Sequence, residues 1–298
     1  MLRIAATLLI TAAFFGTIEA TFIRLIGDRL GLGQMLVFRS GAQVLLVCAL
    51  GGMFTGKGVG MLRTHRLKGH LARGSLAAIV WYCTFMNFRS LDMPLATTLS
   101  FSSQLFILLL AWPVIGERIT REKAAMAGIG FLGVVVAVEL WNPSGLDWRI
   151  SYGLTGSCLG ALMILITRSL SLTEKTETIM FYMAFIVFLS AVPQAALDWR
   201  PIDSTLLAEL VMLSVFGTTG TFFMVEAYRR AEASALAPFP YSRFIFAVAF
   251  GHMVFGDPIK TATIAGAALI ALSNVLPVLR ARRAAARRRV EKAPGAAE

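Results

Sequence analysis

The sequence predicts an all-α integral membrane protein with ten transmembrane helices, arranged as two inverted five-helix repeats. The first observation behind this prediction is composition: 57% of the residues are hydrophobic and 15% are charged, whereas soluble domains carry about 45–50% and about 25%. The second is an internal repeat, because residues 71–140 and 209–278 show the same pattern, and the motifs within 89–117 recur within 229–257 at a constant offset of 140 residues. The mean hydropathy of +0.71 agrees with burial in a bilayer.

Ten stretches of the chain are long and apolar enough to cross a bilayer. Each is close to the roughly 20 residues that a helix needs to span about 30 Å of hydrocarbon. Helices are expected rather than barrel strands, which are about 10 residues long and alternate in polarity. The predicted spans are residues 4–25, 32–54, 71–90, 93–115, 123–140, 152–168, 177–197, 204–228, 234–255 and 260–280.

Basic residues predict the orientation of the chain, because they are retained on the cytoplasmic side of the inner (plasma) membrane. Most of the 28 Lys and Arg residues fall in segments that are cytoplasmic when the N-terminus is inside. Ten crossings then leave both termini in the cytoplasm. Much of the net charge of +11 lies around the tail, residues 281–298. We expect this basic tail to meet anionic headgroups of membrane lipids, and we expect no nucleic acid as a partner.

The two copies of the repeat begin and end with the same types of residue. In the first copy, the segment 89–93 opens an apolar run that ends at Gly116–Glu117; in the second, the segment 229–233 opens one that ends at Gly256–Asp257. Five helices per copy is an odd number, so the second copy enters the membrane upside down. Inverted repeats enclose a site near the middle of the membrane and permit alternating access. The two repeats are assigned to residues 1–140 and 150–280.

These motifs resemble those of a known family. They are the run Leu91–Ala96 leading to Ile115–Glu117, its second copy Ala231–Leu236 leading to Phe255–Asp257, and Phe38–Ser40 on the second helix. The chain resembles the drug/metabolite transporter superfamily, of the EamA type with ten helices, over nearly its whole length. The resemblance implies a secondary active transporter that imports or exports a small organic metabolite. An amino acid, or a related carboxylate or vitamin-like compound, is the implied cargo.

Two other functional classes compete with this interpretation. A translocator of a lipid or of a lipid-linked sugar is permitted by the same superfamily and stays open at this point. A membrane-embedded enzyme is less favoured, because the three His residues are scattered at 65, 70 and 252 and no aspartate-rich diphosphate site is present. We therefore expect no catalytic residues, no metal site and no cofactor. The glycine-rich stretch 51–58 lacks the Ser or Thr that ends a phosphate-binding loop, so transport is expected to run on a gradient.

Two ionisable residues lie at similar depth in the first two spans. A charge in the bilayer core costs at least about 2.5–3.5 kcal/mol, so each needs a partner or a function. Glu19 and Arg39 each lie about two turns from the outer end of their helices, which predicts a buried ion pair. This pair is either a structural clamp or a proton-sensitive gate in which protonated Glu19 releases Arg39. Glu226, near the cytoplasmic end of the eighth span, is a third gating or coupling candidate, unless it simply reaches water.

Arg243 falls near the middle of the ninth span and has no acidic partner that the sequence places at the same depth. Pro238 and Pro240 precede it, and prolines disturb a helix and free backbone carbonyls. A cation beside an interrupted helix suits a substrate carboxylate or another anionic group. The alternative is a structural role, in which Arg243 pairs with Glu226 or with the carbonyl of Gln104.

Polar and aromatic residues on neighbouring spans predict a pocket for a small-molecule substrate that is flat or amphipathic. The candidate substrate-binding residues are Trp81, Tyr82, Ser103, Gln104, Tyr241, Ser242 and Arg243. For Trp81 and Tyr82, packing or a place in the interfacial aromatic belt is the alternative. Small residues on the fifth and tenth spans, Gly128, Gly130, Gly133 and Gly266, predict close helix packing or the seam of a homodimer.

Overall fold

A computed structural model describes residues 2–55, 63–115, 121–137, 139, 141, 147–231, 236, 239–273 and 275–276 of the chain. Several positions used in the sequence interpretation lie outside these described residues: Gly116, Glu117, Glu232, Ala233, Pro238 and the tail 281–298. The described residues are almost entirely α-helical. The helices are α1 (Leu2–Ile26), α2 (Leu32–Thr55), α3 (Leu67–Ser90), α4 (Met93–Ile115), α5 (Arg121–Ala137), α6 (Ile150–Ser171), α7 (Thr176–Leu197), α8 (Ser204–Arg230) and α10 (Ser242–Phe255), followed by the helix Thr261–Ser273.

The helices agree closely with the predicted spans. Five of the described helices are long and apolar enough to cross a membrane, namely α1, α2, α6, α7 and α8, and the chain is a multi-pass membrane protein. The ninth span differs from the prediction of a helix over 234–255. Among its described residues, Leu236 is helical, Phe239–Tyr241 form a short 3-10 turn, η4, and the regular helix α10 begins at Ser242. Pro240 lies in this 3-10 turn, and it explains the interruption, because proline has no N–H to donate and clashes with the preceding turn of an α-helix.

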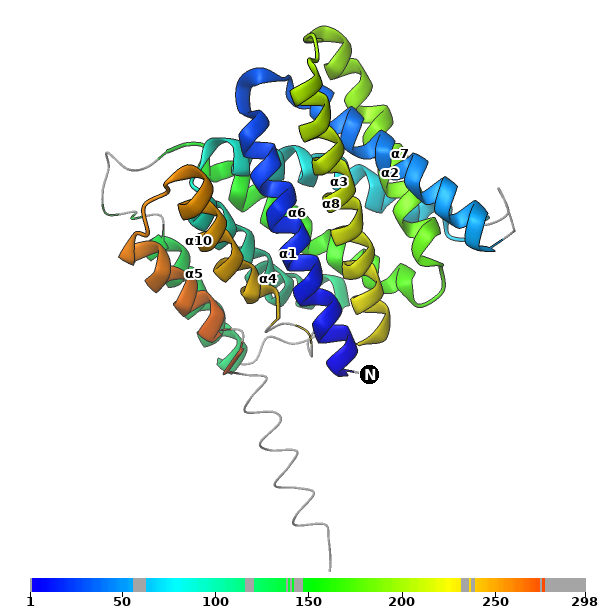
Figure 1. The fold of residues 1–298 in the computed structure, drawn as a ribbon. Helices are drawn as coiled ribbons and strands as arrows, with labels where there is room; N and C mark the ends of the chain where they lie inside the picture. Colours follow the sequence, from blue (N-terminus) through cyan, green and yellow to red (C-terminus); the bar gives the residue numbers. More distant parts are fainter. Residues whose placement is uncertain are drawn as a thin grey trace, which may run out of the picture.

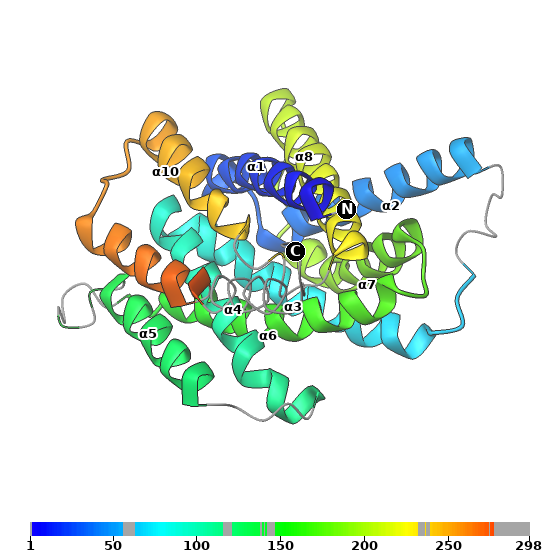
Figure 2. The same cartoon turned by 90° about the horizontal axis from the view of Figure 1, so that it is seen from below.

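Helices from the two copies of the repeat pack against each other in matching pairs. The first helix of the first copy, α1, packs on the third helix of the second, α8; in the same way α6, which opens the second copy, packs on α3. The second helices, α2 and α7, pack on one another. Figures 1 and 2 show α2 and α7 at one end of the bundle and α5, α10 and Thr261–Ser273 at the other. If the two copies have equivalent structures, the first helix of each copy is expected to pack on the third helix of the other, as these helices do.

The glycine and acid that end the second copy form a helix cap. Gly256 has a φ of 67°, the left-handed conformation that glycine adopts without strain. The backbone N–H of Asp257 then donates to the carbonyl of Gly251 at 3.1 Å. This turn buries the Asp257 carboxylate, which accepts from Arg24 of α1 at 2.5 Å and from the backbone N–H of Met93 at 3.0 Å. The motif therefore ties α10 to α1 and to the start of α4.

The small faces predicted on the fifth and tenth spans are used inside the chain. A Cβ at Gly133 would stand 2.8 Å from the carbonyl oxygen of Gly266 and 3.0 Å from the backbone nitrogen of Ile270. Gly130 is similarly close to Ser273, whereas nothing described lies within 4 Å of a Cβ at Gly128. The packing interpretation is therefore confirmed for Gly130, Gly133 and Gly266. Close approach of α5 and the last helix depends on these glycines, because any side chain would push the backbones apart.

Candidate functional site

A cavity of about 290 Å³ lies in the middle of the bundle. Its lining comes from α1, α2, α3, α4, α6, α8, η4 and α10, so both copies of the repeat contribute. The ionisable side chains that line it, among those the structure describes, include Glu19, Arg39 and Arg243. This is the position in which inverted repeats place a substrate site.

Much of the lining consists of residues that occupy equivalent positions in the two copies. The offset of 140 residues that relates the copies in the sequence also relates residues within the lining of the cavity. The pairs are Trp81 and Thr221, Thr84 and Met224, Phe88 and Tyr228, and Ser103 and Arg243. The cavity therefore lies on the pseudo-two-fold axis between the repeats.

A ring contact marks where this axis passes between α4 and η4. Phe101 of α4 and Tyr241 of η4 are also separated by 140 residues, and their ring centroids lie 4.9 Å apart in an edge-to-face arrangement. Two equivalent residues touch each other only where they lie next to the symmetry axis. The two helices that carry Ser103 and Arg243 are thus neighbours across the axis, and α4 and α10 pack directly on each other.

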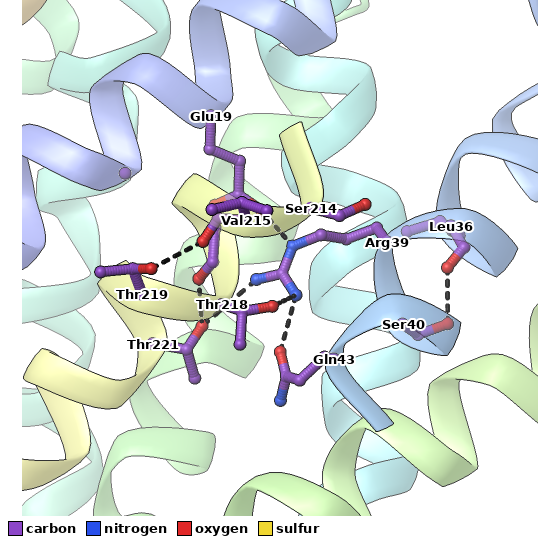
Figure 3. A network of polar contacts seen from close by, with 12 residues as sticks. Glu19, Leu36, Arg39, Ser40, Gln43, Ser214, Val215, Thr218, Thr219 and Thr221 are labelled. Atoms are coloured by element: carbon purple, nitrogen blue, oxygen red, sulfur yellow. Dashed lines mark hydrogen bonds and ion pairs between the residues drawn. The ribbon is translucent and has the colours of Figure 1, made fainter. Parts of the chain in front are cut away.

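Arg39 lies in a nearly complete set of partners (Figure 3). Its Nε donates to the Glu19 carboxylate at 2.5 Å, which confirms the predicted ion pair. Its side chain is 1% exposed, and that of Glu19 is 19% exposed. Its terminal nitrogens donate to Gln43 at 2.6 Å and, at longer range, to the hydroxyls of Thr218 and Thr221. The guanidinium also lies 4.5 Å above the ring of Trp81, a favourable cation–π distance.

Glycine makes room for this cluster on α8. A Cβ at Gly217 would overlap both the Glu19 carboxylate and the Arg39 guanidinium. Gln43, whose oxygen accepts from Arg39, donates its own amide N–H to the carbonyl of Met180 at 3.0 Å. The pair therefore connects α1, α2, α7 and α8.

Arg243 is held much more sparsely than Arg39. Its Nη2 donates to the carbonyl of Gly16 at 3.0 Å, and its guanidinium lies 4.9 Å from the ring centroid of Phe88. Its Nε is buried and has no hydrogen-bond partner in the part of the chain that the structure describes. No described carboxylate lies within ion-pair distance of it, so Arg243 is paired neither with Glu226 nor with another described acid. A buried donor without a partner costs about 1–3 kcal/mol, which makes it a candidate ligand-binding group.

The other predicted pocket residues divide into two groups. Trp81 and Ser103 line the cavity with Arg243. Tyr82 instead contacts the ring of Tyr152 at 6.3 Å. Tyr241 packs on Phe101 beside the cavity, and the hydroxyl of Ser242 donates to the carbonyl of Phe239 at 2.7 Å, within its own turn. The side chain of Gln104 lies outside the described residues.

Glu226 is separate from the cavity. Its carboxylate accepts from the hydroxyl of Thr176 and is ion-paired with Arg230 on the next turn of α8. Arg229 lies 3.7 Å from the same carboxylate. These contacts place Glu226 in a basic cluster at the end of α8, where the structure brings it together with neither Glu19 nor Arg39.

Three further contributors to the site were not singled out from the sequence: the ring of Phe88, the backbone carbonyl of Gly16 and the ring of Tyr228. Every residue has a backbone carbonyl, so the sequence does not indicate which carbonyl takes part in a site. Phe88 and Tyr228 were detectable in principle, since they are aromatic residues 140 positions apart. Reading the repeat residue by residue inside the spans, rather than only at its ends, would have found them.

A two-copy helical bundle around a membrane-embedded cavity is the architecture of a membrane transporter. The profile of the EamA-like transporter family matches residues 3–138 and again residues 147–278. The chain belongs to the EamA-like transporter family. Members of this family are transporters and not enzymes, so the enzyme alternative is set aside.

Characterised relatives transport several kinds of small molecule. The S-adenosylmethionine uptake transporter of Rickettsia conorii is 27% identical over 215 residues, 72% of this chain and 72% of the relative. The pseudopaline exporter of Pseudomonas aeruginosa is 25% identical over 283 residues, 92% and 96% of the two chains. The riboflavin transporter of Rhizobium johnstonii is 28% identical over 225 residues, 75% and 74%. Metabolite transport is thus the activity that these relatives share.

A solved structure has the same fold. It aligns with a TM-score of 0.66 at 17% sequence identity, and the alignment covers 94% of this chain and 98% of the other. The likeness concerns the arrangement of helices alone.

Proposed function

We propose that this protein is a secondary active transporter of a small organic metabolite that carries a carboxylate, such as an amino acid or a related carboxylate or vitamin. The substrate binds in the central cavity, and the two inverted repeats open it alternately to either side of the inner membrane. The observation that carries the proposal is Arg243, a partly buried cation that lines the cavity. Its buried Nε–H has no hydrogen-bond partner among the described residues, and no described carboxylate lies within ion-pair distance of it.

The charge of the cavity supports a substrate with an anionic group. Glu19 and Arg39 neutralise each other, so Arg243 leaves the described lining with one net positive charge (−1 + 1 + 1). An uncompensated charge in a low-dielectric site is expensive, and a bound carboxylate offsets that cost with charge-assisted hydrogen bonds. Arg243 retains free donor capacity for such a group.

The remainder of the lining suits an organic body. Phe85, Phe88, Phe101 and Trp81 provide aromatic walls around a few polar groups, as is common in small-molecule sites. The volume of about 290 Å³ is at the lower end of the usual range for ligand pockets, which is about 300–1,000 Å³. A compact metabolite fits this space better than a lipid. The relatives are named as carriers of three different metabolites, and none of the three is named as a carrier of a lipid.

The Glu19–Arg39 pair acts as a clamp in this proposal. Arg39 has side-chain partners on α1, α2 and α8 in addition to the Trp81 ring, so protonation of Glu19 alone does not release it. Both termini lie in the cytoplasm, and the basic tail contacts anionic lipid headgroups there, because basic segments are retained on that side.

Uptake into proteoliposomes tests the proposal. Purified protein is reconstituted, and a panel of labelled amino acids, carboxylates and vitamins is presented with proton or sodium gradients of either direction. We expect at least one carboxylate-bearing compound to accumulate, and Arg243→Ala to reduce its uptake by about 10-fold or more, because an ion pair in a desolvated site is worth at least about 1.5 kcal/mol.

Arg29→Ala is the matched control. Arg29, which lies between α1 and α2, is ion-paired with Glu209, but its side chain is 45% exposed and does not line the cavity. Its loss should leave uptake unchanged. Uptake by Arg243→Ala at the wild-type rate, for every compound that the wild type carries, would show that Arg243 does not bind the substrate.

A further inference from the structure

Ser103 occupies in the first repeat the position that Arg243 occupies in the second. The two residues are 140 positions apart, and both line the cavity. Each lies two residues beyond the Phe101–Tyr241 contact that marks the pseudo-two-fold axis. Because a two-fold axis carries each residue of a pair onto the other, Ser103 and Arg243 lie on opposite sides of it. Both belong to the lining of one cavity, and we call these two positions its poles.

The two poles differ in charge. Arg243 brings a fixed positive charge and an unpartnered N–H. Ser103 donates its hydroxyl hydrogen to the carbonyl of Ser100 at 2.9 Å, and Ser100 in turn donates to the carbonyl of Ala96 at 2.9 Å. With their hydrogens used within α4, these hydroxyls offer only lone pairs to the cavity. This pole is therefore uncharged and accepts hydrogen bonds.

We propose that position 103 determines how many negative charges the substrate carries. The accepted substrate has one carboxylate, bound at Arg243, and a neutral or hydrogen-bond-donating group that reaches Ser103; this inference rests on the proposed function of Arg243. A second carboxylate would meet acceptor oxygens in a site without a second unpaired cation among the described lining residues. Desolvating it there without a partner is strongly unfavourable, so dicarboxylates are excluded.

The pseudo-symmetry makes this proposal testable by gain of function. Ser103→Arg places a second arginine at the equivalent of Arg243, and Arg243→Ser combined with Ser103→Arg moves the single arginine to the other pole. The probes are L-glutamine and L-glutamate, with L-asparagine and L-aspartate as a shorter pair, since each pair differs by one charge at nearly constant size. The measurement is the ligand-dependent rise of the unfolding temperature of the purified protein, titrated to give Kd.

We expect wild type to bind the amide member of a pair at least about 10-fold more tightly than the acidic member. Ser103→Arg should bind the acidic member about 10-fold more tightly than wild type does, because it gains a desolvated charge pair. The transposed double variant should keep the wild-type preference for the amide, because it again has one arginine. Arg243→Ser alone should lose affinity for all four amino acids.

The outcomes separate the two proposals. If Arg243→Ser binds as wild type does, the proposed function at Arg243 fails. If Arg243→Ser loses binding but neither Ser103→Arg nor Ser103→Lys gains affinity for glutamate or aspartate, the role of position 103 is wrong while the function of Arg243 stands. The lysine variant guards against an arginine that does not fit, and the unfolding temperature without ligand verifies that each variant is folded. Absence of stabilisation by all four probes in both gain-of-function variants also overturns the inference.

Discussion

Arg39 and Arg243 both lie on the wall of one cavity, yet their surroundings differ. Arg39 has an acid, an amide, two hydroxyls and an aromatic ring around its guanidinium. Arg243 has one backbone carbonyl, one aromatic ring and an N–H without a partner among the described residues. In the first arrangement, groups of the protein itself accept the hydrogen bonds of the guanidinium. The second leaves part of it for a group that the protein does not provide.

The comparison teaches that the number of partners separates a structural charge from a binding one. A fully partnered buried pair is costly to break, because either member is then left as an uncompensated charge. A sparsely partnered charge already bears part of that cost in the empty protein, so its removal should harm binding more than folding. The predictions below test this division, from the largest expected effect to the smallest.

Arg39→Ala should lower the free energy of unfolding by about 3–5 kcal/mol, because it removes a fully buried arginine and leaves the mostly buried Glu19 without its counter-ion. Equilibrium unfolding in mixed detergent micelles measures this loss. Arg243→Ala, measured in parallel, should lose less than about 1 kcal/mol. Equal losses for the two variants would erase the distinction between the arginines.

Glu19→Gln should lower the free energy of unfolding by about 1–3 kcal/mol, since the amide oxygen still accepts from Arg39 but no longer neutralises it. Uptake and its dependence on pH should stay as in wild type, because the pair is a clamp. The measurement is the rate of uptake in proteoliposomes between pH 5 and pH 8. A pH profile that becomes flat in this variant would instead identify Glu19 as the proton-sensitive gate.

Arg243→Lys should raise the Kd for a carboxylate substrate by about 10-fold while the protein stays folded. Lysine keeps the positive charge but lacks the planar fork that binds a carboxylate through two parallel hydrogen bonds. Ligand-dependent thermal stabilisation provides the Kd. The same substitution at Arg39 should affect stability and leave Kd unchanged; an effect on Kd from Arg39→Lys alone would reverse the proposed roles.

Phe88→Leu should have the smallest effect, a rise in KM of about 2- to 5-fold. The substitution keeps an apolar side chain but removes the cation–π contact that orients the Arg243 guanidinium, a contact worth about 0.5–2 kcal/mol. The maximal rate of uptake should hold, because the substrate-binding groups remain in place. A fall in maximal rate at constant KM would mean that Phe88 acts in the conformational change instead.

Sequence reasoning reached the helices, the two copies and the Glu19–Arg39 pair, and each has a strong physical signal. Apolar length reports a span, the offset of 140 residues reports the repeat, and two opposite charges at matching depth on adjacent helices leave few alternatives to pairing. The disturbance of the ninth span by its prolines was predicted, and a 3-10 turn lies at Phe239–Tyr241; the residue at which regular helix resumes, Ser242, has no signal of its own in the sequence.

The partners of Arg243 were beyond the sequence. A backbone carbonyl such as that of Gly16 is not distinguished by residue type, and the stacking of Phe88 depends on how α3 lies against α10. Tyr82 was indistinguishable from Trp81 in the sequence, because adjacent aromatic residues on a helix differ only in the direction they face. That direction is set by packing, which brings Trp81 to the cavity and Tyr82 to Tyr152.

Thiol labelling inside the cavity tests most directly whether the space between the repeats is the path of the substrate. Thr84, which lines the cavity on α3, is replaced by cysteine in a protein whose Cys48, Cys83 and Cys158 have been changed to serine. We predict that a membrane-impermeant thiol reagent modifies Thr84→Cys from either side of the membrane, and that the transported carboxylate slows the modification in proteins with Arg243 but not in Arg243→Ala. Modification from neither side, or modification that the substrate never slows, would contradict the account.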